Sequence, residues 1–174
     1  MGSGKSKTMP FNIQSLNRQG AIHFTGDPNF TPDELYSNTK QELGPGLYVT
    51  PQDNVDYWFR ALQPQYAVPV DMKGLKVLDV ADVPHGSTLS KAIISHYGSP
   101  SKALSIIEAE QSRITGDTFG AESFQIAQIR VYAKMKGYSA LSKSDRIEGK
   151  QILIFDPSRV KLGKPEPVDN AFKR

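Results

Sequence analysis

The stretch Gly44-Pro45-Gly46-Leu47-Tyr48-Val49-Thr50 holds the clearest local signal of the chain. Its glycines can take backbone angles that other residues avoid, and its proline fixes its own φ, so a tight turn is predicted. The run from Leu47 to Thr50 is apolar, aromatic and β-branched, which favours a strand. The turn would deliver Tyr48 onto a sheet beside a glycine, which suits a flat ligand lying against the backbone. A plain turn into a core strand is the alternative.

The composition limits the classes of protein to consider. The chain has 174 residues, about one domain, with 38% hydrophobic residues and a formal net charge of +3. A charge this small does not by itself indicate a nucleic-acid partner. The absence of cysteine from the sequence excludes disulfides and thiolate metal sites. His23, His85 and His96 are far apart and lack metal-ligand spacing, so no metal is expected.

The sequence contains no apolar run near the ~20 residues that a membrane span requires, and its polar start lacks the apolar stretch of a signal peptide. We therefore expect no membrane partner. A cytoplasmic location is expected, or delivery into a target or host cell as part of a longer protein. Residues 1–10 are interpreted as a linker or an artificial leader, residues 11–165 as the folded domain, and residues 166–174 as a tail.

Strand and helix signals follow one another without regular alternation. Apolar, β-branched runs bounded by turn residues predict strands, whereas i, i+3, i+4 apolar spacing and capping residues predict helices. Besides the stretch above, strands are predicted at residues 21–26, 66–72, 75–80, 138–141 and 151–155. Helices are predicted at residues 52–62, 88–97, 101–112 and 121–136, with a short one starting at Thr31. This order predicts an α+β fold with helices packed on split antiparallel sheets.

Three finer details are also predicted. Ser101 is expected to cap the helix that starts there. Glu108, Glu110 and Arg113 are expected to form a solvated face of that helix. The polar stretch 142–150 is expected to be a loop.

Three strand-like segments stand in order along the chain: Ile22-His23-Phe24-Thr25, the Gly44–Thr50 stretch, and Gln151 to Ser158. Together they resemble the ADP-ribosyltransferase fold of the diphtheria-toxin and poly(ADP-ribose)-polymerase type. That family carries a His-x-Thr/Ser strand, a Gly-x-Gly-Ile/Leu-Tyr strand, and a late strand reading Glu, three apolar residues, Phe or Tyr, and Asp. The resemblance spans residues 20–162 and implies that fold for this chain.

The later half resembles bacterial and phage toxin-like members most closely. Features that recur there are a Pro-Val strand, a Leu-x-Val-x-Asp strand, a helix ending in Gly-Tyr, and a closing Phe-Asp-Pro-Ser. The matching segments here are Val68-Pro69-Val70, Leu75-Lys76-Val77-Leu78-Asp79, Gly137-Tyr138 and Phe155-Asp156-Pro157-Ser158. The resemblance thus implies a toxin or effector domain, with an immunity or antitoxin protein as a further partner.

The resemblance also implies roles for the residues that match the motifs. His23 would hydrogen-bond a ribose of NAD, with Thr25 assisting from the same strand. Tyr48 and Tyr57 would stack on the two faces of the nicotinamide ring, and Gly46 would let that ring approach the backbone. Nicotinamide is planar and cationic in NAD, so an aromatic pair binds it by stacking and cation–π attraction.

One position departs from the family pattern. The family's glutamate stabilises an oxocarbenium-like transition state with its charge, and the matching residue here is Gln151. The implied catalytic set is therefore Gln151, Tyr48 and His23. Three explanations stay open: an introduced Glu→Gln change that disarms a toxin, a natural variant whose acid comes from Glu148 or Glu122, or a domain that binds NAD-like ligands without turnover.

The function implied is mono-ADP-ribosyl transfer from NAD, the co-substrate, to a macromolecule, with release of nicotinamide and without a metal. Asn54, in the helix predicted at residues 52–62, is included among the cofactor-binding residues. The acceptor, protein or nucleic acid, is left open. One alternative is a catalytically inactive module that binds NAD, ADP-ribose or a protein partner, and another is an NAD glycohydrolase. Poly(ADP-ribose) synthesis is the least expected product, because elongation depends on the missing glutamate.

Overall fold

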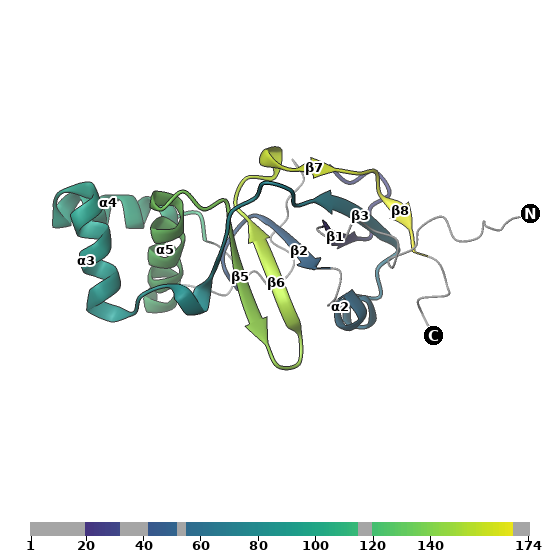
Figure 1. The fold of residues 1–174 in the computed structure, drawn as a ribbon, viewed down its shortest axis with the longest axis horizontal. Coiled ribbons are helices and arrows are strands. Elements are labelled where there is room, and N and C mark those ends of the chain that lie inside the picture. Colours follow the sequence, from purple (N-terminus) through teal and green to yellow (C-terminus); the bar gives the residue numbers. More distant parts are fainter. Residues whose placement is uncertain (1–19, 32–41, 52–54, 115–119, 169–174) are drawn as a thin grey trace, which may run out of the picture.

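The structure, a computed structural model, describes residues 20–31, 42–51, 55–114 and 120–168. Within these ranges eight strands form one sheet in the order β4-β5-β6-β2-β1-β3-β7, and β8 also pairs with β3 (Figure 1). The strands are β1 (Gly20–Thr25), β2 (Leu47–Pro51), β3 (Tyr66–Asp71), β4 (Val77–Asp79), β5 (Ala140–Asp145), β6 (Gly149–Ile154), β7 (Lys161–Leu162) and β8 (Glu166–Pro167). Neighbouring strands run antiparallel, except for the parallel pair β4 and β5.

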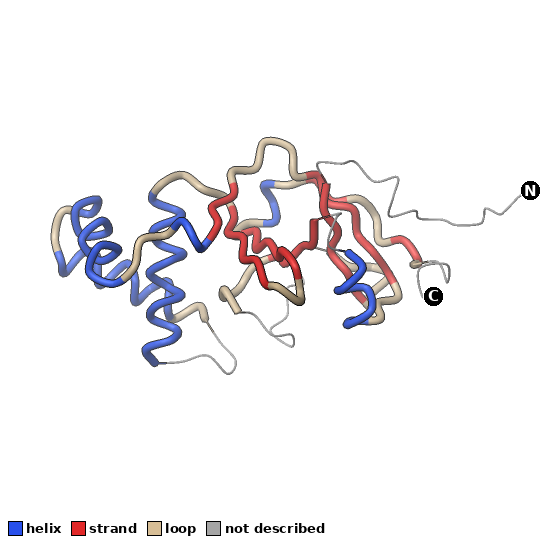
Figure 2. Tube along the Cα trace, turned by 60° about the horizontal axis from the view of Figure 1, so that its bottom comes forward, coloured by secondary structure: helices blue, strands red, loops and turns tan. Residues whose placement is uncertain are grey.

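The α-helices of the described ranges form two groups. They are α2 (Val55–Leu62), α3 (Gly86–Tyr97), α4 (Pro100–Gln111) and α5 (Gly120–Met135). Helices α3, α4 and α5 gather at one end of the molecule, on the side of β5 (Figures 1 and 2). Helix α2 lies in the other half and contacts β1 and β2. Among the described helices, none has the length and apolar character needed to cross a bilayer.

The sheet carries an apolar cluster on each face. Side chains alternate between the two faces of a strand, so Leu141 of β5 and its cross-strand partner Leu153 of β6 share one face. There they pack with residues of α3, α4 and α5 in a cluster that we call the helix-side core. Ile152 and Ile154 point the other way and pack with Val49 in a second cluster. The β6–β2 part of the sheet is therefore buried on both faces.

The ladder between β1 and β2 is short. It consists of two residue pairs, Ala21 with Pro51 and Ile22 with Thr50. On its other edge, β1 pairs with β3 at six positions from Gly20 to Thr25. The sheet therefore opens between β1 and β2 directly after Ile22, at the position of His23.

The prediction of an α+β fold is confirmed, and so is the antiparallel character of most of the sheet. The prediction of a loop at 142–150 was wrong, because β5 continues to Asp145 and β6 starts at Gly149, which makes this polar stretch a hairpin. Alternating polar residues are compatible with strands whose faces reach solvent. Sequence polarity alone therefore did not separate hairpin from loop.

Two further boundaries differ from the prediction. Ser99, not Ser101, caps α4: its Oγ accepts the backbone N–H of Lys102, and Pro100 takes the first helical position. The tail expected from residue 166 begins instead with β8, which pairs with β3. The linker at residues 1–10, most of the helix predicted from Thr31, and residues 52–54 lie outside the described ranges.

Candidate functional site

Three strands that lie far apart in the sequence are direct neighbours in the sheet. The order β6-β2-β1 places the strand of Gln151 beside the strand of Tyr48, and the strand of Tyr48 beside that of His23. We call these three residues and their strands the three-strand site. The segments that matched the family motifs are thus brought together by the fold.

His23 bridges the opening between β1 and β2. Its Nδ1 lies 2.8 Å from the backbone carbonyl oxygen of Tyr48. Because a carbonyl can only accept, Nδ1 carries the proton of the neutral ring and Nε2 carries the lone pair. Nε2 makes no hydrogen bond to the part of the chain that the structure describes. The ring also contacts Phe30, with centroids 4.6 Å apart.

The protonation of His23 follows from its surroundings. Burial lowers the pKa of His23, and the hydrogen bond to the Tyr48 carbonyl opposes that shift without cancelling it. The ring is therefore held neutral over a wider pH range than a free histidine. A fixed neutral ring offers Nε2 as an acceptor for a ligand hydroxyl.

The three side chains do not share one face of the sheet. Tyr48 pairs with Leu153, and Gln151 lies two residues from Leu153, so Tyr48 and Gln151 are on the same face. Ile22 pairs with Thr50 on that face as well, which places the next residue, His23, on the other. The fold thus places Tyr48 and Gln151 at diagonal positions on one face of adjacent strands, and it places the His23 side chain on the other face, bonded to the backbone carbonyl of Tyr48.

The hydroxyl of Tyr48 closes the turn before β2. It donates to the carbonyl of Gly44 at 2.6 Å and accepts the backbone N–H of Leu43 at 3.0 Å. Its half-buried ring packs against the helix-side core, and burial raises the pKa of the hydroxyl. Tyr48 therefore has a structural role in this turn, and its stacking role stays a prediction.

The neighbouring strand β6 leaves no room for a side chain at Gly46. Its φ is +148°, and a Cβ built there would lie 2.6 Å from the carbonyl oxygen of Ile154 and would also meet the side chain of Leu153. Strand β6 thus already explains why this position has no side chain. The role of Gly46 in admitting a nicotinamide ring stays a prediction.

Arg130 on α5 binds the turn before β2 from the protein interior. The residue is fully buried, and its Nη1 donates to the carbonyls of Leu43 at 2.8 Å and Pro45 at 2.9 Å. Its Nε donates to Glu110 at 2.6 Å, and Lys134 pairs with the same carboxylate at 2.9 Å. This buried network anchors the turn of the three-strand site to helices α4 and α5.

The sequence contains a signal for this network, an arginine on the apolar face of a helix. Glu110 is 8% exposed, so its assignment to a solvated face was wrong. The buried positions Ile126, Ala127, Arg130 and Val131 share one face of α5. An arginine on such a stripe requires a buried acidic or carbonyl partner. Burial acts to raise the pKa of Glu110, but the hydrogen bonds from Arg130 and Lys134 outweigh it and hold that pKa below its usual value.

The surroundings of Gln151 contain a charged pair. Its cross-strand partner on β5 is Lys143, whose Nζ lies 3.5 Å from a carboxylate oxygen of Glu42. Glu148 lies in the turn of the β5–β6 hairpin, where its backbone N–H donates to Asp145. Glu122 is exposed in the first turn of α5.

The remaining predicted residues lie near the opening or outside the described part. Thr25 ends β1, and its Oγ1 accepts the backbone N–H of Asp27 at 3.1 Å. Tyr57 is half-buried on α2, the helix that contacts β1 and β2. Asn54 lies outside the described residues. Within the described ranges, no three His, Asp or Glu side chains gather as metal ligands.

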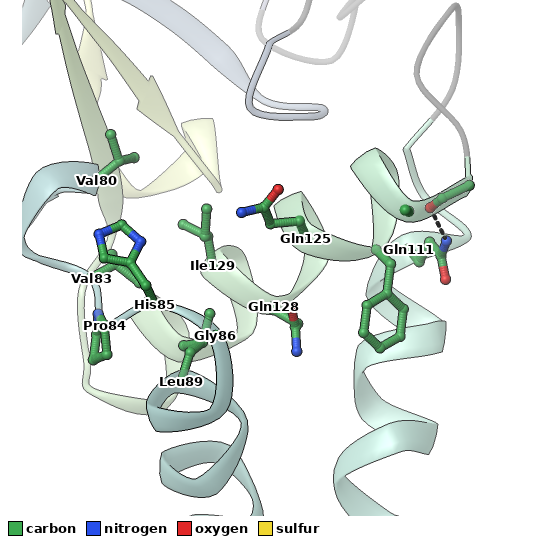
Figure 3. A pocket seen from close by; sticks show the side chains of 13 residues that line it. Val80, Val83, Pro84, His85, Gly86, Leu89, Gln111, Gln125, Gln128 and Ile129 are labelled. Atoms are coloured by element: carbon green, nitrogen blue, oxygen red, sulfur yellow. Dashed lines mark hydrogen bonds between the residues drawn. The ribbon is translucent and has the colours of Figure 1, made fainter.

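A cavity of about 690 Å³ lies elsewhere, among the helices (Figure 3). Its walls come from α3, α4, α5 and the segment before α3, and β1, β2 and β6 do not contribute to it. The polar lining consists largely of the amides Gln111, Gln125 and Gln128, with His85 as the titratable side chain. Amides can orient a ligand but cannot serve as an acid, base or nucleophile. Among the lining residues, His85 is the side chain that could act as an acid or base.

The comparisons with known proteins add little. No protein-family model and no curated protein matches the sequence. A solved structure described as "Crystal structure of an anti-CRISPR protein" is 12% identical, with a TM-score of 0.40, covering 84% of this chain and 94% of that one. A likeness at this level is too weak to bear on function.

Proposed function

We propose that this chain is an NAD-dependent mono-ADP-ribosyltransferase with an ADP-ribosyltransferase-like fold. The observation that supports it is the strand order β6-β2-β1, which makes neighbours of the three segments that resemble the family motifs. Their separation in sequence, from residue 22 to residue 158, makes this adjacency a property of the fold rather than of local sequence. NAD would lie across the opening between β1 and β2.

His23 supplies the second support. Its ring is fixed by the 2.8 Å hydrogen bond to the Tyr48 carbonyl, and burial keeps it neutral. A neutral ring with Nδ1 protonated presents Nε2 as an acceptor for a ribose hydroxyl of NAD. Fixing the ring before the ligand arrives reduces the entropy lost on binding.

The reaction requires the protein mainly to position NAD and to stabilise the positive charge that develops. The bond between C1′ of the ribose and the nicotinamide nitrogen breaks, and its electron pair leaves on nicotinamide, which becomes neutral. The positive charge moves to C1′, which then forms a bond to a nucleophilic atom of the acceptor, and that atom's proton passes to solvent. Stacking by Tyr48 and by Tyr57 of the adjacent α2 would orient the leaving ring.

The acceptor is proposed to be macromolecular, a protein or a nucleic acid, with the chain acting as a toxin or effector domain. An immunity or antitoxin protein would then be its natural inhibitor.

A second candidate is a module that binds NAD or ADP-ribose without turnover. The observation that favours it is Gln151, an amide on the face of Tyr48 where the resembling family has a carboxylate. An amide can hydrogen-bond a ribose hydroxyl but cannot stabilise a developing cation by charge.

One assay separates the two candidates. The wild-type chain is incubated with NAD labelled in its adenosine half, with and without cell lysate, and both nicotinamide release and label on macromolecules are measured. NAD binding to the same chain is measured by calorimetric titration. The transferase predicts nicotinamide release together with label on a lysate component, and loss of both in His23→Ala. NAD binding without release would support the binding module, and neither binding nor release would contradict both candidates.

A further inference from the structure

The face that carries Tyr48 and Gln151 also carries a charged pair. Lys143 is the direct cross-strand neighbour of Gln151, and such neighbours have Cβ atoms about 5 Å apart on one face. The Nζ of Lys143 lies 3.5 Å from the carboxylate of Glu42. A residue from the turn before β2 is thus tied to the strand pair that holds Gln151.

Glu42 is also linked to Tyr48. It immediately precedes Leu43, whose backbone N–H donates to the Tyr48 hydroxyl at 3.0 Å. Burial raises the pKa of Tyr48, and the charge of Glu42 acts in the same direction. Glu42 therefore lies near both Tyr48 and the Gln151–Lys143 pair.

We propose that Glu42 is a catalytic residue that supplies the negative charge that Gln151 lacks. This inference rests on the proposed function. As the bond from C1′ to nicotinamide breaks, the carboxylate of Glu42 stabilises the positive charge that develops at C1′ and on the ring oxygen. Gln151 hydrogen-bonds a hydroxyl of the same ribose. The two tasks of the family's glutamate are thus carried here by two residues, the amide of Gln151 on β6 and the carboxylate of Glu42 in the turn before β2.

The pairing with Lys143 positions this carboxylate without cancelling its charge. The side chain of Lys143 is 43% exposed and that of Glu42 is 27% exposed, so water screens the pair. Such partly exposed pairs are weak. Lys143 therefore neutralises little of the negative charge of Glu42.

Glu148 and Glu122, the two acids suggested by the sequence, lie in less suitable positions than Glu42. Glu148 lies in the hairpin turn beyond the start of β6, and its offset of three residues from Gln151 does not match the two-residue repeat of a strand face. Glu122 is exposed on α5, among the helices at the end of the molecule.

The test compares nicotinamide release from NAD by wild type, Glu42→Gln, Gln151→Glu and the double variant Glu42→Gln/Gln151→Glu. Glu108→Gln, the same change on the exposed side of α4, is the matched control. Calorimetry with NAD and the melting temperature are recorded for every variant. We expect Glu42→Gln to lower the rate about 10²–10³-fold, with NAD affinity and melting temperature close to wild type. Adding Gln151→Glu should restore most of the rate, and Glu108→Gln should leave it unchanged.

Two results would overturn the role of Glu42. One is a Glu42→Gln rate equal to that of wild type, and the other is an inactive wild type that becomes active with Gln151→Glu. Failure of the proposed function is a different outcome, in which neither wild type nor Gln151→Glu binds NAD or releases nicotinamide.

Discussion

His23 joins two strands through its side chain where the backbone ladder has ended. Its Nδ1–H satisfies the Tyr48 carbonyl, which lies beyond the last β1–β2 pair. A carbonyl left buried without a donor would cost about 1–3 kcal/mol. The residue is therefore useful to the fold even before a ligand is considered.

The first prediction concerns the pH dependence of stability. Burial lowers the pKa of His23 below the value of the unfolded chain, which is about 6.5. The unfolded state then binds the proton more readily, so the stability contributed by neutral His23 is complete above that value and is lost as the pH falls below it. Urea unfolding from pH 7.5 to 5 should show a smaller acid loss in His23→Gln than in wild type. The exposed His96→Gln should behave as wild type, and equal pH slopes for all three chains would refute the assignment.

At the scale of elements, helix α5 and the turn before β2 form one unit. Arg130 donates to two carbonyls of the turn and pairs with Glu110 of α4. The guanidinium also lies 5.1 Å from the ring of Phe155, directly after β6. The position of Tyr48 therefore depends on helices that are remote from it in sequence.

The second prediction tests that unit. Arg130→Met leaves Glu110 buried with Lys134 at 2.9 Å and Arg113 at 3.8 Å, and it leaves two turn carbonyls without their donor. Removing one partner of a buried pair costs about 3–5 kcal/mol. The double variant Arg130→Met/Glu110→Leu should lose clearly less than the sum of the single changes, because no buried carboxylate is left without Arg130. Denaturant unfolding of the four chains measures the coupling, and additive losses would show that the two residues act independently.

The third prediction concerns the contact between the turn and β6. Gly46→Ala should destabilise the chain by about 2–4 kcal/mol, because a Cβ meets the backbone of β6 at a φ that suits glycine. Gly26→Ala is the matched control, since no heavy atom lies within 4 Å of its added Cβ. Unfolding free energies that are equal in the two variants would contradict the close approach of turn and strand.

At the scale of the whole molecule, local patterns were sufficient for most elements. The turn at Gly44–Gly46, the strand after it and the helix closed by Gly137 follow from backbone preference and apolar spacing. The pairing of strands was not predictable from such local preferences. Strands β3 and β4 are consecutive in sequence yet are separated in the sheet by four other strands, because β4 pairs with β5 after three intervening helices.

The candidate site, like the fold, could be predicted only in part from local sequence. His23, Tyr48 and Gln151 were found because each lies in a short motif, and their strands meet in the sheet. The contacts of Arg130 and the proposed role of Glu42 were not predicted, because they depend on residues 85 and 101 positions away in sequence. Polar residues whose function arises through tertiary contacts leave little trace in local sequence.

The central claim is that NAD binds at the opening between β1 and β2. The most direct measurement is calorimetric titration of NAD into wild type, His23→Ala and His85→Ala, with the melting temperature of each chain recorded. The account predicts saturable binding to wild type, loss of at least ~10-fold in affinity in His23→Ala, about 1.4 kcal/mol, and unchanged affinity in His85→Ala. Absence of NAD binding to folded wild type, or loss of binding in His85→Ala but not in His23→Ala, would contradict it.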